Sequence, residues 1–238
     1  MPSEAQQLLW LVVLQDVVFA LLTVAVFWAG IFVARRLGSR ARYSLAALGL
    51  VRPKGGLFAG ARLGLLVGLG ILVMSWAVGA LSVLVLESLG YSAKNTAQDA
   101  LIRGLRGWVG EDPAFAIPAA AFVVVLFVPL VEELVFRGAI FGGLYRLGLL
   151  VLRKTSEKGV SPTARWTALV PAALFSSVAF ALLHLSPVVF PALLVLAVVL
   201  CVLYERSGSL LPTFVAHATF NSFATLLIIL SGLGALPY

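Results

Sequence analysis

The feature that most constrains this chain is a series of long apolar runs that are almost free of formal charge. Roughly 20 apolar helical residues cross a hydrocarbon core about 30 Å thick, and most of the runs approach that length. The runs are Val17–Val33, Leu63–Leu86, Ala114–Val131, Ala168–Leu183, Val188–Tyr204 and Leu210–Leu230. Charged residues make up 11% of the 238 positions, whereas soluble domains carry roughly 25%. The sequence therefore predicts an all-α, polytopic membrane protein with about six to eight transmembrane helices.

The formal net charge of +7 comes largely from two groups of basic residues between the runs. One group lies between the first and second runs: Arg35, Arg36, Arg40, Arg42, Arg52, Lys54 and Arg62. The other lies between the third and fourth runs: Arg146, Arg153, Lys154, Lys158 and Arg165. This distribution follows the positive-inside rule. It favours cytoplasmic loops beside anionic lipid over a nucleic-acid partner, and six spans would then place both termini on the other side.

No long polar linker divides the spans, so we expect a single membrane domain, 1–238, with a catalytic core at 114–230. The mixed stretch Gly90–Pro113 is expected to form an amphipathic surface helix. The third run continues as a helical pattern to about Lys154, which predicts either a projecting helix or a break near Pro129. The first run lacks a basic start and is expected to be a retained helix and not a signal peptide.

The first motif that carries chemistry is Glu132-Glu133 followed by Arg137. Glu133 and Arg137 are four residues apart with the acid first, which is the favoured order for an ion pair on a helix. Neighbouring helical residues point about 100° apart, so Glu132 needs a different partner. A carboxylate without a matched charge in an apolar cavity suits a general acid or base. The structural alternative, a Glu–Arg clamp between helices, needs only one acid.

The two histidines of the chain lie in or at the end of apolar runs. His184 follows Phe180 by four residues and precedes a Ser-Pro pair, where the helix is expected to stop. His217 and Asn221 are also four apart and share one helix face. An imidazole beside an amide is suited to stabilising a developing oxyanion. Each pair alone also fits helix packing, since His and Asn commonly form hydrogen bonds between membrane helices.

Together these residues support activation of water. Glu132 and His184 are predicted to orient and deprotonate a water, and His217 and Asn221 to stabilise the oxyanion that follows. No serine lies in a nucleophile elbow. We expect no cofactor and no metal, although two histidines and a glutamate are also familiar zinc ligands, which leaves zinc as an alternative. Cys201 lies inside an apolar run and is read as a small apolar filler.

The order Glu-Glu-x-x-x-Arg, Phe-x-x-x-His and His-x-x-x-Asn resembles the CAAX protease and bacteriocin-processing family, also called the Abi family. The motifs are matched at Glu132, Glu133 and Arg137, at Phe180 and His184, and at His217 and Asn221. The resemblance covers about Ala114 to Leu230. It implies a helical fold around an intramembrane cavity and a metal-independent glutamate mechanism. In that mechanism Glu132 and His184 are the water-activating pair, and His217 and Asn221 form the oxyanion hole.

The expected activity is therefore that of an intramembrane endopeptidase in the cell membrane. Its expected partners are the lipid bilayer and a peptide or protein substrate, either near the C-terminus of a prenylated protein or in a peptide precursor. Two alternatives stay open. A non-catalytic immunity or scaffold protein would keep the polar residues for packing, and a proton-coupled transporter would use them as a relay. The absence of repeated halves weighs against the transporter.

Overall fold

The residues described by the computed structural model, 4–36, 44–91, 99–154 and 161–236, form helices and connecting loops without a strand. Within them, six helical segments are long and apolar enough to cross a membrane. These are Gln6–Val33, Leu57–Ser88, Pro113–Leu152, Pro162–Leu182, Phe190–Ser207 and Leu210–Gly232. The predicted all-α, polytopic fold is confirmed, with a number of spans at the lower end of the expected range.

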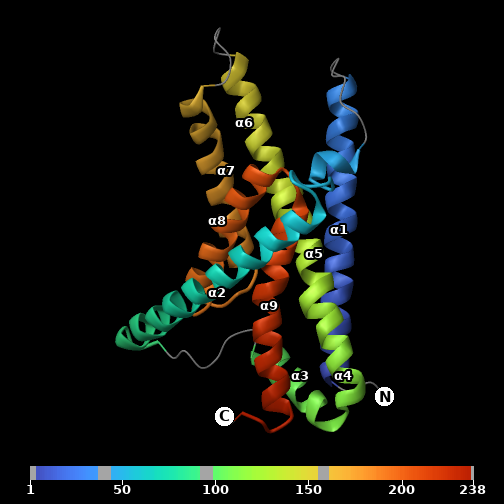
Figure 1. Cartoon of the computed structure of the whole chain (residues 1–238), viewed down its shortest axis with the longest axis vertical. Helices are drawn as coiled ribbons and strands as arrows, with labels where there is room; N and C mark the ends of the chain where they lie inside the picture. Colours follow the sequence, from blue (N-terminus) through green and yellow to red (C-terminus); the bar gives the residue numbers. More distant parts are fainter. Residues whose placement is uncertain (1–3, 37–43, 92–98, 155–160, 237–238) are drawn as a thin grey trace.

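The elements follow one another in a simple order (Figure 1). They are α1 (Glu4–Arg36), the 3₁₀ turn η1 (Leu45–Leu48), α2 (Leu57–Ser88), α3 (Asp99–Glu111), α4 (Pro113–Ala120), η2 (Ala121–Phe127), α5 (Val128–Glu132), η3 (Glu133–Phe141), α6 (Gly142–Lys154), α7 (Pro162–Leu182), α8 (Phe190–Ser207) and α9 (Leu210–Gly232). The first apolar run was expected to begin at Val17, but α1 begins at Glu4. Asp16 therefore lies well inside a helix and not in front of it.

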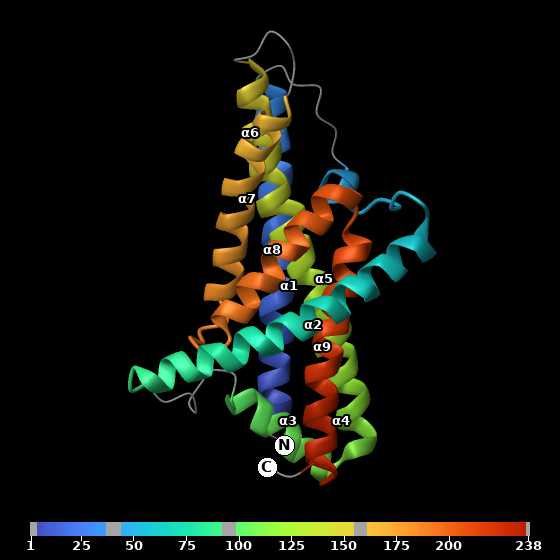
Figure 2. The ribbon, with the colours of Figure 1, turned by 60° about the vertical axis from the view of Figure 1, so that its left-hand side comes forward.

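The third span is one continuous helical rod from α4 to α6 (Figures 1 and 2). Two of its segments, η2 and η3, are π-helical, which means that each turn holds more residues than in an α-helix. Pro118 and Pro129 each remove a backbone donor along the rod. The π-helical segments let the helix continue past these prolines. Of the two predicted alternatives, a projecting helix and a break near Pro129, the structure has the projecting helix.

The basic ends of α1 and α6 lie at the same end of the molecule, and the start of α1 lies at the opposite end with the end of α9 (Figure 1). Arg35 and Arg36 form the last turn of α1. Arg40, Arg42 and Lys158 lie outside the described residues. This is the arrangement that the positive-inside prediction requires.

Helix α2 crosses the other spans at a steep angle, and its later half projects from the bundle (Figure 2). Its first half packs tightly on α9 through Gly64 and Gly68. A Cβ on Gly64 would lie 2.4 Å from the carbonyl oxygen of Pro212, and one on Gly68 would lie 2.7 Å from that of Ala216. Small residues four apart let membrane helices approach this closely.

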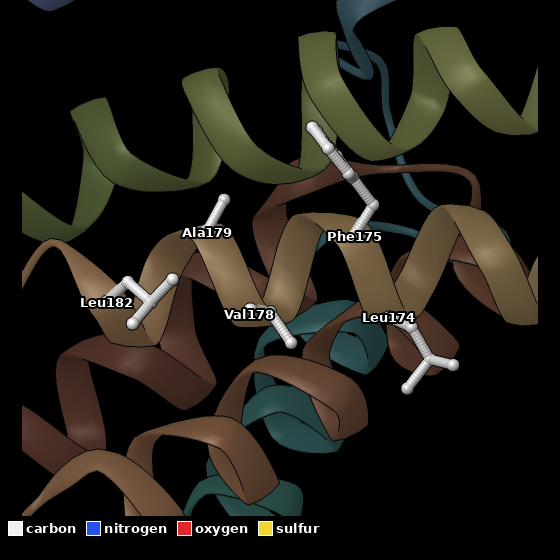
Figure 3. A pocket seen from close by; sticks show the side chains of 5 residues that line it. All are labelled: Leu174, Phe175, Val178, Ala179 and Leu182. Atoms are coloured by element: carbon white, nitrogen blue, oxygen red, sulfur yellow. The ribbon is translucent and has the colours of Figure 1, made fainter. Parts of the chain in front are cut away.

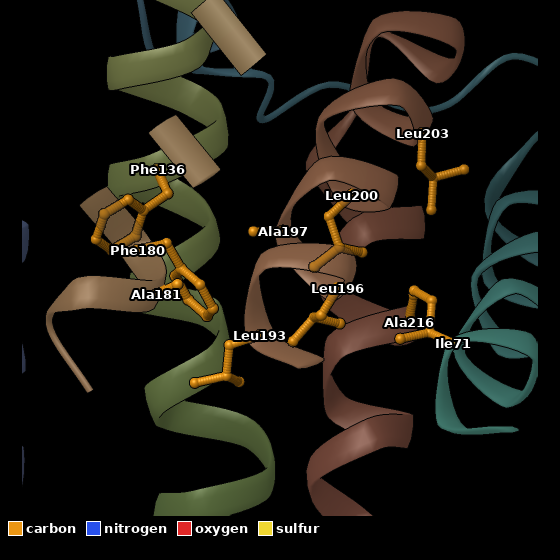
Figure 4. Packing of buried hydrophobic residues seen from close by; sticks show 10 residues of the cluster. All are labelled: Ile71, Phe136, Phe180, Ala181, Leu193, Leu196, Ala197, Leu200, Leu203 and Ala216. Carbon is orange, nitrogen blue, oxygen red and sulfur yellow. The ribbon is translucent and has the colours of Figure 1, made fainter. Parts of the chain in front are cut away.

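An apolar core joins α2, η3, α7, α8 and α9 (Figure 4). Its members are Ile71, Phe136, Phe180, Ala181, Leu193, Leu196, Ala197, Leu200, Leu203 and Ala216. A second cluster holds α3, whose buried side chains Leu105, Trp108 and Val109 pack with Leu9 of α1. Within the stretch expected to form an amphipathic helix, Asp99–Glu111 is thus helical with one face buried, and residues 92–98 lie outside the described part of the chain. Two of the core elements position the histidines: α9 carries His217, and His184 follows the end of α7.

Candidate active site

A fully buried ion pair forms the centre of the candidate site. Nη1 of Arg137 lies 2.9 Å from Oε1 of Glu133, and both side chains are 0% exposed. The same carboxylate oxygen lies 2.9 Å from Nδ1 of His217 on α9. Because a carboxylate only accepts hydrogen bonds, Nδ1 of His217 is the donor. Glu133 therefore links η3 to α9, which the spacing of the motif alone did not indicate.

Glu132 approaches the other nitrogen of the same ring. Its Oε2 lies 3.5 Å from Nε2 of His217, and its side chain is 18% exposed. The two neighbouring glutamates thus face one imidazole from two sides. Only Glu133 also pairs with Arg137, as the four-residue spacing predicted. Glu132 is left with the more exposed of the two positions.

The ring of Phe180 connects the second motif to this centre. It lies 5.7 Å from the ring of His217 and 4.8 Å from that of His184, measured between centroids. The guanidinium carbon of Arg137 lies 4.7 Å from the same centroid, over the ring face. Such a cation–π contact stabilises a desolvated cation by about 2 kcal/mol. Phe180 therefore has a clear packing role between the charged centre and His184.

His184 lies in the loop after α7, and its Nδ1 is 2.9 Å from the carbonyl oxygen of Phe180. A carbonyl only accepts, so Nδ1 carries the proton. Burial lowers the pKa of His184 below its ordinary value, which leaves the ring neutral at pH 7. Its Nε2 is then free to accept a proton. No ion pair joins His184 to Glu132 in the described part of the chain.

Asn221 is held by η2 on its own side of α9. Its Nδ2 donates to the carbonyl oxygen of Val124 at 3.0 Å. An amide nitrogen carries two hydrogens, so one remains for another acceptor. Helix α9 begins as expected at Ser209, whose Oγ accepts from the amide of Leu211 at 3.3 Å. His217 and Asn221 thus project from one face of a capped helix.

A surface hollow lies elsewhere, along the outside of α7 (Figure 3). Its lining is wholly apolar: Leu174, Phe175, Val178, Ala179 and Leu182. Activation of water needs polar groups, so this hollow does not serve the chemistry of the charged centre.

The described residues contain no group of three or more His, Cys, Asp or Glu side chains placed to hold a metal ion. Cys201 is buried beside Ser177, with 3.8 Å between Sγ and Oγ, as expected of a packing residue. Sequence reasoning also missed that Asp16 is buried inside α1, with 3% exposure. It is the one charged residue of the sequence between Glu4 and Arg35, and that isolation was the available signal.

These features define a polytopic membrane protein with a buried acid–imidazole centre. Residues 114–223 match the model of the family described as type II CAAX prenyl endopeptidase Rce1-like. The match includes all three motifs and leaves α1 and α2 outside. Comparisons with curated proteins and with solved structures gave no match. Membership of an endopeptidase family implies a protease and a protein substrate.

Proposed function

We propose that this chain is an intramembrane endopeptidase that hydrolyses a peptide bond with a water activated by Glu132 and His184. The observation that carries the proposal is the partly accessible carboxylate of Glu132, 3.5 Å from His217, inside an otherwise apolar bundle. The match to an endopeptidase family over the same segment supports hydrolysis. Holding a carboxylate at this depth is costly, which speaks for a chemical role.

In the proposed reaction, Glu132 takes a proton from water and the resulting hydroxide attacks the peptide carbonyl carbon. Nε2 of His184 accepts a hydrogen bond from the same water and orients it. The carbonyl oxygen becomes an oxyanion, which Nε2 of His217 and the free N–H of Asn221 stabilise. Glu132 then returns its proton to the departing amine as the C–N bond breaks.

If His217 is to stabilise the oxyanion, its ring must be in a particular protonation state. Its Nδ1–H already donates to Glu133, so donation to an oxyanion from Nε2 requires a proton on both nitrogens. The two flanking carboxylates favour that imidazolium form, whereas the burial of the ring, which is 2% exposed, opposes it. When Glu132 accepts the proton of water, its hold on Nε2–H weakens, and that hydrogen becomes available to the oxyanion. This couples the attack step to oxyanion stabilisation.

We further propose that the whole chain, 1–238, is one membrane domain, with 114–230 as its catalytic core in the cell membrane. Two substrate classes fit: the C-terminal peptide of a prenylated protein, and a peptide precursor. The family description favours the first. The scaffold and transporter alternatives lack this support.

The experiment is cleavage of a peptide library, prenylated C-terminal peptides included, by the purified protein and by Glu132→Gln, each with and without chelator. Glu111→Gln is the matched control, because Glu111 is exposed on α3. We expect cleavage that survives chelator, persists in Glu111→Gln and falls by about 10²–10⁴-fold in Glu132→Gln. Loss of cleavage on chelation would point to zinc. No cleavage by the well-folded wild type would overturn the proposal in favour of a scaffold, and pH-driven flux in liposomes would favour a transporter.

A further inference from the structure

A buried serine joins α7 to the helical rod beside it. The hydroxyl of Ser176 on α7 donates to the backbone carbonyl oxygen of Phe136 on η3, with 2.8 Å between the two oxygens. Ser176 is 1% exposed, so solvent does not compete for this bond. A carbonyl oxygen has two lone pairs, so it can accept from a serine as well as from an amide of its own helix. Serine hydroxyls form such hydrogen bonds between membrane helices.

The acceptor of this bond lies in a π-helical segment, and the other π-helical segment of the rod has a similar bond. Phe136 belongs to η3. Val124, whose carbonyl oxygen accepts from Asn221 at 3.0 Å, belongs to η2. Each segment thus receives a side-chain hydrogen bond from one of the two helices that position the histidines, α7 and α9. Because π-helical turns frequently occur at functional sites, these two contacts are candidates for a role beyond packing.

The face of α7 that carries Ser176 also carries the second motif. Phe180 and His184 follow Ser176 at intervals of four residues, so the three lie along one side of α7 and of the turn after it. The rings of Phe180 and Phe136 pack edge to face, with 5.1 Å between their centroids (Figure 4). His184 lies against the other end of this line, since its Nδ1 donates to the carbonyl oxygen of Phe180. The bond from Ser176 therefore holds this face of α7 against η3.

The register of α7 on the rod determines where His184 lies relative to Glu132. Helix α7 runs antiparallel to the rod beside it (Figures 1 and 2). Glu132 lies four residues before Phe136, and His184 lies eight residues after the serine, so both lie on the same side of the hydrogen bond. A slip of α7 by one residue would move His184 by about 1.5 Å along the helix axis and turn it by about 100°. A misplacement of about 1 Å can lower a rate by about 10²-fold.

We propose that Ser176 is a positioning residue, whose hydrogen bond to Phe136 sets the register of α7 and so places His184 beside the water that Glu132 activates. The inference rests on the proposed function, because it takes Glu132 and His184 to share one water. Ser176 acts through His184 and exchanges no proton, since its hydroxyl hydrogen is held by the carbonyl oxygen. It lies outside the three motifs and adds a residue to the catalytic unit.

The first test compares Ser176→Ala with Ser177→Ala in the full chain. Ser177 is the matched control, because it is the next residue of α7, is 0% exposed and has its hydroxyl 3.8 Å from Sγ of Cys201 on α8. Both substitutions remove one buried hydroxyl, so a general loss of packing would affect them equally.

We expect kcat to fall by about 10- to 100-fold in Ser176→Ala and to stay near the wild-type value in Ser177→Ala. KM should be unchanged in both, because His184 acts on the water and not on substrate binding. Both variants should unfold near the wild-type denaturant concentration, since one hydrogen bond between membrane helices contributes little stability. Equal kcat in the two variants would overturn the inference. Failure of Ser176→Ala alone to fold would also overturn it, because the serine would then be structural.

The second test does not depend on activity. The chain has two histidines, so protein that is isotope-labelled in histidine alone gives two sets of ring signals in an NMR spectrum. The set that is missing from His184→Ala belongs to His184. We expect this set to shift in Ser176→Ala, because the imidazole moves relative to the ring of Phe180, and to stay in place in Ser177→Ala. Unchanged His184 signals in Ser176→Ala would overturn the positioning role.

The two tests separate this inference from the proposed function. If the wild type cleaves nothing, the proposed function fails, and the NMR spectra still show whether Ser176 fixes the position of His184. If the wild type cleaves and Ser176→Ala behaves as Ser177→Ala does in both tests, this inference alone fails.

Discussion

Glu132 and Glu133 are neighbours in sequence, yet they occupy contrasting surroundings. Glu133 is fully buried and contacts both Arg137 and His217 at 2.9 Å. Glu132 is 18% exposed, with one looser contact of 3.5 Å to His217. The charge of Glu133 is thus paired with that of Arg137, and its contact with His217 joins η3 to α9. The looser contact of Glu132 leaves its carboxylate free to react.

The difference follows from helix geometry. Successive residues point about 100° apart, so adjacent acids on η3 and α5 face different neighbours. Glu133 meets Arg137 four residues on, and Glu132 faces Nε2 of His217. We propose that the Glu133–Arg137 pair serves as the scaffold and that Glu132 is the reactive carboxylate.

The largest expected effect is on the scaffold. Arg137→Ala leaves Glu133 buried without its cation, which should lower the free energy of unfolding by about 3–5 kcal/mol. Chemical denaturation in detergent, followed by circular dichroism, measures this change. The double variant Arg137→Leu with Glu133→Leu should recover much of that stability, because no unpaired charge remains. A fully stable Arg137→Ala protein would contradict the scaffold assignment.

A smaller effect is expected for the amide on α9. Asn221→Ala should lower kcat by about 10²–10³-fold, the usual result of removing one oxyanion donor. Its unfolding free energy should fall by only about 0.6 kcal/mol through loss of the bond to Val124. Steady-state kinetics and denaturation on the same preparation separate the two. Unchanged kcat would leave Asn221 as a packing residue.

The smallest expected effect concerns the packing that holds α9 in place. Gly68→Ala brings a Cβ to within 2.7 Å of the carbonyl oxygen of Ala216, next to His217. Overpacking of this kind should cost about 1–3 kcal/mol of unfolding free energy. Gly70→Ala is the matched control on the same helix, since its Cβ would meet nothing within 4 Å. Equal stability of the two variants would show that the close approach of α2 and α9 is not needed.

The sequence predicted the elements whose signal is local. The long apolar runs indicated the spans, and a spacing of four residues placed Glu133 beside Arg137. The cap at Ser209 followed from the residue type at the start of an apolar run. These features depend on residues close together in the chain, so a pattern is enough to find them.

What the sequence did not reveal depends on which helices meet. The contact of His217 with both glutamates requires α9 to lie against η3, and no spacing specifies that. The apolar run begins at Val17, so the sequence pattern puts Asp16 before the first span, whereas the structure has it inside α1. The role of the α2 glycines, which is to let α2 approach α9 closely, also becomes clear only from the contact between the two helices.

The most direct test of the central claim measures cleavage and unfolding in parallel for Glu132→Gln and Glu133→Gln. We predict that Glu132→Gln unfolds at the wild-type denaturant concentration and has lost its cleavage activity. Glu133→Gln should unfold more easily, because Arg137 is then buried without its counter-ion. Cleavage at the wild-type rate by Glu132→Gln, or wild-type stability in Glu133→Gln, would contradict the division of roles between the two carboxylates.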